Sequence, residues 1–188
     1  MTETPNPHIV DADTLTGEMR PIRRAVLALG SNLGERLTSL QGAVNALADT
    51  PDVWVTEVSP VYETEPQDAP EGSETFLNAV VLIDTTLAAT RLLDRAHAIE
   101  DAFGREREEP NGPRTLDVDL IVVGDRRGHD DSLRLPHPRA AERAFVLQPW
   151  YDVEPDAVIP DVGAIADLLE KTDRSGIARR DDIALQIQ

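Results

Sequence analysis

The chain of 188 residues contains 18 basic and 35 acidic residues, so its formal charge is −17. This charge argues against a general nucleic-acid-binding or anionic-membrane surface, and an anionic substrate would have to bind at a local basic cluster. The chain lacks cysteine, which excludes a disulfide, a thiolate nucleophile and a cysteine-ligated metal.

The length suits one domain with a sizeable core. Residues 1–22 are acidic, contain proline and show little periodicity, so we expect a flexible N-terminal extension there. We expect the domain itself over residues 23–172 and a weakly ordered tail over residues 173–188. No run approaches the roughly 18 apolar residues of a membrane span, and the N-terminus lacks the apolar core of a signal peptide. We therefore expect a cytoplasmic protein.

Hydrophobic periodicity predicts alternating strands and helices. Short apolar or alternating runs predict strands at residues 25–29, 53–58, 76–83 and 116–123. Residues 61–62 are predicted to continue the second strand past Pro60 as an edge or bulge. Apolar residues at helical spacing predict helices at residues 37–49 and 87–103, with shorter ones around 139–147 and 165–169. This β-α-β-β-α-β order predicts an α+β, ferredoxin-like fold: an antiparallel sheet with both helices on one face, plus appended C-terminal helices.

Two acids stand on the last of these strands. Strand side chains alternate between faces, so Asp117 and Asp119 point the same way, with Cα atoms about 6.5 Å apart. Neighbouring carboxylates repel each other unless a cation joins them, and Mg²⁺ takes oxygen ligands that it often shares with substrate phosphates. A solvated strand end with two acids of no special role is the alternative from this segment alone. The opposite face is predicted to point into the core, with Leu116, Val118, Leu120 and Val122.

Three arginines fall within ten positions just before the acids: Arg105, Arg107 and Arg114. Arginine forms forked hydrogen bonds with phosphate, so metal and phosphate could meet here. The glutamates between the arginines could instead pair with them on the surface. The nearby aspartates favour phosphate binding.

Several other residues allow a functional and a structural interpretation. His137 lies between two prolines, which suits a positioned ligand contact or an ordinary rigid turn. His97 and Glu100 share a helix face, which by itself is typical of a solvated surface. The turn at residues 30–34 lies between a strand and a helix but lacks the ending of a phosphate-binding loop, which favours a structural turn.

Phe76 and Asn78 alternate onto one strand face. An aromatic ring and an amide two residues apart could stack on and hydrogen-bond a planar heterocycle. A core phenylalanine beside an edge asparagine is the structural alternative.

Five segments of the chain form a recognisable set: residues 28–34, 62–66, 76–80, 112–119 and 135–147. The set, with its order and spacing, is far more specific than any one segment. Together they resemble the 6-hydroxymethyl-7,8-dihydropterin pyrophosphokinase family of folate biosynthesis, over about residues 24–162. The family transfers pyrophosphate from ATP to the hydroxymethyl group of a reduced pterin and releases AMP.

The resemblance implies a role for each candidate residue. Two Mg²⁺ ions would bind Asp117 and Asp119, and the loops at residues 65–75 and 105–113 would close over the substrates. The catalytic residues would be Arg105, Arg114, Asp117 and Asp119. ATP would contact His97, Glu100, Arg105, Arg107, Arg114, His137 and Arg143. The pterin would contact Thr64, Phe76, Asn78 and Phe145.

Two departures from the family pattern concern the nucleotide side. Asn111 stands where some relatives carry tryptophan, and His97 stands where some carry glutamine. The expected partners are the small-molecule substrates alone, with neither nucleic acid nor membrane, and the expected state is a monomer.

Two other functions are compatible with the residues. Another Mg²⁺-dependent phosphoryl or glycosyl transferase could use the Asp117 and Asp119 pair without a pterin. A non-catalytic ferredoxin-like ligand-binding module would bind a small molecule without turnover and would tolerate loss of both acids. The arginine-rich segment before the paired acids disfavours such a module.

Overall fold

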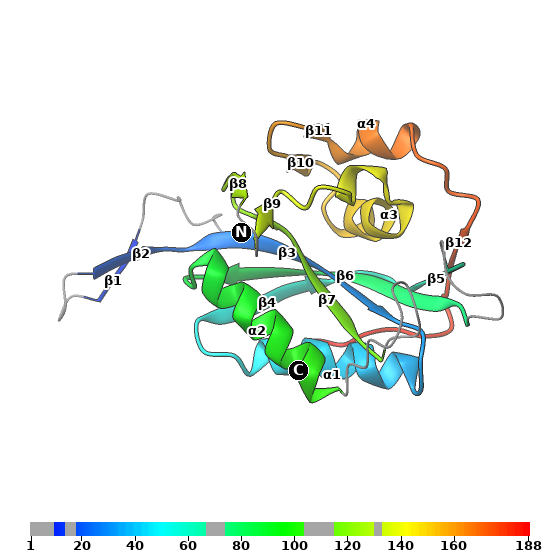
Figure 1. Cartoon of the computed structure of the whole chain (residues 1–188), viewed down its shortest axis with the longest axis horizontal. Helices are drawn as coiled ribbons and strands as arrows, with labels where there is room; N and C mark the ends of the chain where they lie inside the picture. The colour runs from blue at the N-terminus through cyan, green and yellow to red at the C-terminus, as the bar shows by residue number, and fades with distance from the viewer. Residues whose placement is uncertain (1–9, 14–17, 67–73, 104–114, 130–132) are drawn as a thin grey trace.

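The computed structural model describes residues 10–13, 18–66, 74–103, 115–129 and 133–188 (Figure 1). Its centre is a six-stranded sheet in the order β12-β5-β6-β3-β7, with β4 also paired to β6. Every pairing within this sheet is antiparallel. The strands are β3 (Arg23–Ser31), β4 (Val53–Val58), β5 (Tyr62–Thr64), β6 (Phe76–Thr85), β7 (Asp117–Val123) and β12 (Ile177–Arg179). The prediction of an α+β protein built on an antiparallel sheet is confirmed.

One edge of β6 is covered by two strand segments, β4 and β5, separated by a short irregular stretch. Ser59 bridges the break: its backbone N–H donates to Val80 O at 2.9 Å, and its Oγ accepts from Val80 N at 2.8 Å. The hydroxyl supplies an acceptor next to Pro60, where the regular ladder is interrupted. The predicted continuation of the strand past Pro60 is confirmed.

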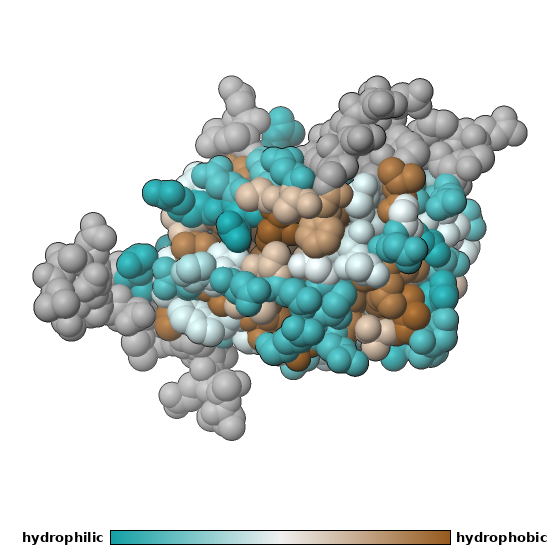
Figure 2. Space-filling model, turned by 90° about the horizontal axis from the view of Figure 1, so that it is seen from below, coloured by the Kyte–Doolittle hydropathy of each residue, from teal (hydrophilic) through white to brown (hydrophobic). Residues whose placement is uncertain are grey.

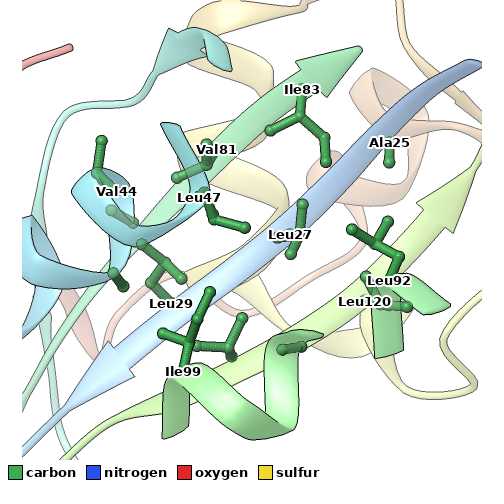
Figure 3. Packing of buried hydrophobic residues seen from close by; sticks show 14 of the residues in the cluster. Ala25, Leu27, Leu29, Val44, Leu47, Val81, Ile83, Leu92, Ile99 and Leu120 are labelled. Atoms are coloured by element: carbon green, nitrogen blue, oxygen red, sulfur yellow. The ribbon is translucent and has the colours of Figure 1, made fainter. Parts of the chain in front are cut away.

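Helices α1 (Arg36–Ala48) and α2 (Ala89–Ala102) cover one face of the sheet (Figure 1). Leu27 and Leu29 of β3 meet Leu47 of α1 and Leu92 of α2 in the core beneath them (Figure 3). Burying each such leucine stabilises the fold by about 1.5–3 kcal/mol. From outside, this side of the molecule shows hydrophilic residues interspersed with hydrophobic ones (Figure 2).

The opposite face carries a second core beneath α3 (Ala144–Val153) and α4 (Ile165–Glu170). The helix predicted at residues 139–147 is wrong in its bounds: a 3₁₀ turn, η1 (Ala140–Glu142), comes first, and α3 then continues to residue 153. It runs through Pro149 because Pro149 and Trp150 are buried, and packing outweighs the local cost of proline. Short pairs complete the structure: β8 (Gly128–His129), β9 (Arg134–Leu135), β10 (Val158–Ile159) and β11 (Gly163–Ala164).

The alternation along β7 changes phase near its end. Val26 of β3 pairs with Val122, but Leu27 pairs with Leu120, so Ile121 is the extra residue of a bulge. Val122 therefore joins the second core with Ile121 rather than the first core, and its predicted orientation is wrong. The residues before the bulge keep the predicted alternation.

Both ends of the chain contain more regular structure than the sequence led us to expect. In the N-terminal extension, β1 (Val10–Asp13) and β2 (Glu18–Pro21) form an antiparallel hairpin. At the C-terminus, β12 pairs with β5, and Leu185 is only 6% exposed in the first core. Gln41 of α1 exchanges two hydrogen bonds with the backbone of Gln186, at 2.8 and 2.9 Å. The expected weak order of residues 173–188 is therefore wrong, because apolar residues there pack against α1.

None of the helices in the described ranges has the length and apolar character of a membrane span.

Candidate active site

The sheet face beneath α3 carries predicted metal-binding residues and predicted pterin-contacting residues. Gly30 of β3 pairs with Asp117 on one side and with Asn78 on the other, so the three form a row across the sheet. Cross-strand partners project from the same face, and two inter-strand spacings separate Asp117 from Asn78 by about 9–10 Å. Asp119 lies on the same face one pleat further along β7, opposite Ala28. The two acids and the amide thus lie on one face of the sheet, on either side of β3.

Asn78 and Thr64 form a buried polar pair at one end of this row. Asn78 Nδ2 donates to Thr64 Oγ1 at 2.7 Å, and the two residues are 6% and 4% exposed. Phe76 pairs with Thr64 across the strands and is half-buried. The hydrogen bond sets the orientation of the amide, which is needed if its remaining polar atoms are to recognise the edge of a ligand.

Gly30 is a site residue that sequence reasoning treated only as part of a turn. A Cβ at this position would lie 2.9 Å from Asn78 Oδ1 and 3.7 Å from Phe76 Cδ1. A side chain here would displace the amide, so glycine is required for the close approach of Asn78. A glycine at the end of a buried strand was the available signal, but its neighbours across the sheet could not be read from the chain.

Arg143, at the start of α3, lies among acidic and basic groups that include the two carboxylates of β7. Burial and the nearby charge of Arg139 lower the pKa of Arg143, whereas Asp119 and Asp117 act to raise it. Its guanidinium lies over the Phe145 ring, 5.5 Å from the centroid, in a cation–π contact. Arg143 therefore links the carboxylate pair to one of the predicted pterin-contacting rings.

His137 is held beside the same cluster by backbone contacts. The backbone N–H of His137 donates to Ile121 O at 2.8 Å. The ring Nδ1 of His137 accepts from the backbone N–H of Arg139 at 3.2 Å. Nδ1 is thus an acceptor, and the neutral ring carries its proton on Nε2. Burial, followed by the positive charges of Arg143 and Arg139, lowers the pKa of His137 to about 4. At neutral pH the ring is a neutral donor in an environment that favours an anion.

The donor set at Asp117 and Asp119 fits a magnesium ion shared with substrate. Within the described ranges, no group of three or more histidine, aspartate or glutamate side chains is arranged to hold a metal. Two carboxylates on one strand face are the partial ligand set that Mg²⁺ uses when phosphate oxygens and water complete its shell.

A cavity of about 200 Å³ opens beside the Asn78–Thr64 pair. Thr64 and Phe145, two of the predicted pterin contacts, both line it. Its other walls come from the end of β5, the start of α3 and the segment before β12, with Glu65, Glu142, Ala144, Asp173, Ser175, Gly176 and Ile177.

The remaining predicted residues are less well connected to this face. His97 is exposed and Glu100 is only 3% exposed, so the two do not share a solvated surface. They belong to α2, which packs on the opposite face of the sheet from the two carboxylates. Their nucleotide role stays a prediction. The other predicted residues and loops lie outside the described part of the chain. They are Arg105, Arg107, Arg114, Asn111, the whole of the loop at residues 105–113 and most of the loop at residues 65–75.

A family model and the sequences of known proteins both show similarity to one family. Residues 26–155 match the model of the family described as 7,8-dihydro-6-hydroxymethylpterin-pyrophosphokinase. A protein of Methylorubrum extorquens named 2-amino-4-hydroxy-6-hydroxymethyldihydropteridine pyrophosphokinase is 43% identical over 83% of this chain and 98% of its own length. A protein of the same name from Pseudomonas aeruginosa is 39% identical over 84% of this chain and 97% of its own.

A solved structure has a similar fold. The crystal structure of wild-type Plasmodium falciparum HPPK-DHPS superposes with a TM-score of 0.66 at 15% identity. The match covers 82% of this chain and 45% of that longer one, so the present chain spans less than half of it. At this identity the likeness concerns the fold.

Proposed function

This chain belongs to the 7,8-dihydro-6-hydroxymethylpterin-pyrophosphokinase family, and we propose that the face of the sheet beneath α3 is its active site. The protein is an ATP-dependent pyrophosphokinase of folate biosynthesis, which transfers pyrophosphate from ATP to the hydroxymethyl group of 6-hydroxymethyl-7,8-dihydropterin. The observation that supports the site is the row formed by Asp117, Gly30 and Asn78. It brings a strand with paired carboxylates and an amide suited to ring recognition to the two sides of Gly30 on one sheet face.

The reaction requires alignment more than a protein nucleophile. The hydroxymethyl oxygen of the pterin attacks the β-phosphorus of ATP, the bond to the α,β-bridging oxygen breaks, and AMP leaves. Holding the two substrates in line supplies much of the rate acceleration, because it replaces an unfavourable encounter by a positioned one.

Each described residue has a role in that alignment. Asn78 and Thr64 orient the pterin edge, and Phe76 and Phe145 contact its ring. Arg143 places positive charge near the phosphates, and His137 offers its Nε2–H to a phosphate oxygen. These side chains hold their groups before substrate arrives, so little reorganisation is needed during the reaction.

Asp117 and Asp119 would hold Mg²⁺, and we propose two ions at this position. When bound, the metal supplies positive charge that offsets the negative charge of the phosphoryl oxygens. The arginines of the undescribed segment before β7, Arg105, Arg107 and Arg114, would add further charge on the phosphate side.

Three finer features belong to the same proposal. The strand order β7-β3-β6-β4 with α1 and α2 on one face supports a ferredoxin-like topology for the core. The net charge of −17 supports small-molecule substrates rather than nucleic acid or an anionic membrane as partners. We also propose a cytoplasmic monomer.

Product analysis tests this function. Incubation with ATP, Mg²⁺ and 6-hydroxymethyl-7,8-dihydropterin should yield AMP and the pterin diphosphate in equal amounts, measured by chromatography and mass spectrometry. The matched 6-methyl pterin, which lacks the accepting hydroxyl, should yield neither. ATP breakdown that ignores the pterin would support another transferase, and binding without turnover would support a ligand-binding module.

A further inference from the structure

The cavity beside Thr64 has a wall that no family motif supplies. Asp173, Ser175, Gly176 and Ile177 line it from the C-terminal side, beyond the matched residues 26–155. Phe145 and Thr64 line the same cavity. Residues from the end of the chain therefore border the same space as two predicted pterin contacts.

This C-terminal turn, residues 173–177, is anchored to the sheet at several points. Ser175 N donates to Asp173 Oδ1 at 2.9 Å, which closes the turn on itself. Glu65 N donates to Gly176 O at 3.2 Å, and Ile177 pairs with Thr64 at the start of β12. These hydrogen bonds hold the turn in a fixed position along one side of the cavity.

A second anchor lies just beyond the turn. Arg180 Nη1 donates to Glu63 Oε2 at 3.1 Å, and Arg36 Nη1 donates to the same oxygen at 3.2 Å. The end of the chain is thereby tied to β5 and to the start of α1.

The lining chemistry selects among the possible ligands. Among the residues that the structure describes, the lining combines one aromatic ring with hydroxyls and carboxylates and contains no lysine, arginine or histidine. Three carboxylates line the cavity against a nearby cation, Arg143, whose guanidinium lies over the Phe145 ring, so this wall is less suited to phosphate groups. A flat heterocycle with N–H donors would find acceptors and a ring to stack against. The cavity thus suits the pterin rather than the triphosphate.

We propose that the C-terminal turn is part of the dihydropterin site and determines which acceptors fit, an inference that rests on the proposed function. Gly176 is the smallest of the described residues that line the cavity. A Cβ there would meet no atom within 4 Å, so the fold can accept a larger side chain at the edge of the cavity.

The test is Gly176→Val, with Ala178→Val as the matched control. Ala178 is exposed on β12 and does not line the cavity, but the substitution adds similar apolar bulk two residues away. We expect Gly176→Val to raise the KM for the dihydropterin by at least about tenfold, because filling a formed site excludes its ligand. The KM for ATP and the melting temperature should stay near parental values, and Ala178→Val should change none of the three.

A parental pterin KM in folded Gly176→Val would overturn the proposal, as would equal increases in both KM values. If Gly176→Val does not fold, Ser175→Ala takes its place, and an unchanged pterin KM in that variant is the contradicting result. Direct titration with the dihydropterin distinguishes failure of the proposed function from failure of the proposed role of the turn. Parent protein that binds the pterin without forming AMP refutes the proposed function alone, and the turn is then judged by whether Gly176→Val weakens that binding. Parent protein that does not bind the pterin refutes both.

Discussion

Gly30→Ala should damage the site through Asn78, and the size of the effect follows from the geometry. The new Cβ would lie 2.9 Å from Asn78 Oδ1, so the amide must move and its hydrogen bond to Thr64, now 2.7 Å, is lost or weakened. Leaving a buried polar group unsatisfied costs about 1–3 kcal/mol. The methyl group itself favours a strand by about 0.5–1 kcal/mol over glycine. The free energy of unfolding should therefore fall by about 1 kcal/mol.

The assay is a double-mutant cycle with Asn78→Ala, read by urea unfolding and by steady-state kinetics. Asn78→Ala alone should raise the KM for the dihydropterin and leave the KM for ATP nearly unchanged. In that background the clash is absent, so adding Gly30→Ala should stabilise the protein by about 0.5–1 kcal/mol instead of destabilising it. The reversal of sign is the expected signature.

Additive destabilisation in both backgrounds would refute the claim that Gly30 acts by making room for the amide. Equal losses of pterin and ATP affinity in Asn78→Ala would refute the assignment of Asn78 to the pterin side.

Three further predictions concern other parts of the chain. Folding lowers the pKa of His137 from 6.5 to about 4, so the unfolded chain binds more protons than the folded one between these pH values. The free energy of unfolding should therefore decline as pH falls from about 6.5 to about 4. The urea midpoint of His137→Gln should decline less over this range than that of the parent protein. Deleting residues 1–22 should leave turnover unchanged, and a large drop would show that the extension takes part in the reaction. Arg36→Ala should lower the free energy of unfolding by about 1–3 kcal/mol, because Arg36 donates to Glu63 and twice to Thr75; denaturation that matches the parent protein would contradict this.

The central strands and the first two helices could be predicted because their hydrophobic periodicity is strong. The alternation in β7 placed Asp117 and Asp119 on one face, and the pairing with β3 agrees. The phase change at Ile121 could not be seen, because a bulge is set by the partner strand rather than by its own residues. In the same way, α3 extends through Pro149 owing to burial that local propensity does not report.

The packing of the C-terminus could not be predicted for a related reason. Ile183 and Leu185 form too short a pattern to predict structure alone, yet they pack against the first core next to α1. The positions of Gly30 beside Asn78 and of the C-terminal turn beside Thr64 could not be predicted either, since both depend on contacts between residues distant in sequence. The types of candidate site residues could be read from the chain, whereas the neighbours of the glycine and of the turn could be identified only from the fold.

We propose that the β7 strand with its two carboxylates, on the sheet face beneath α3, is essential for pyrophosphoryl transfer to the pterin. The most direct test is pterin-dependent AMP formation by the parent chain, by Asp119→Ala and by the control Asp125→Ala, which removes an exposed acid just past the same strand. We expect activity in the parent and the control, and its collapse in a folded Asp119→Ala that still binds the dihydropterin. Undiminished AMP formation by Asp119→Ala would contradict the account.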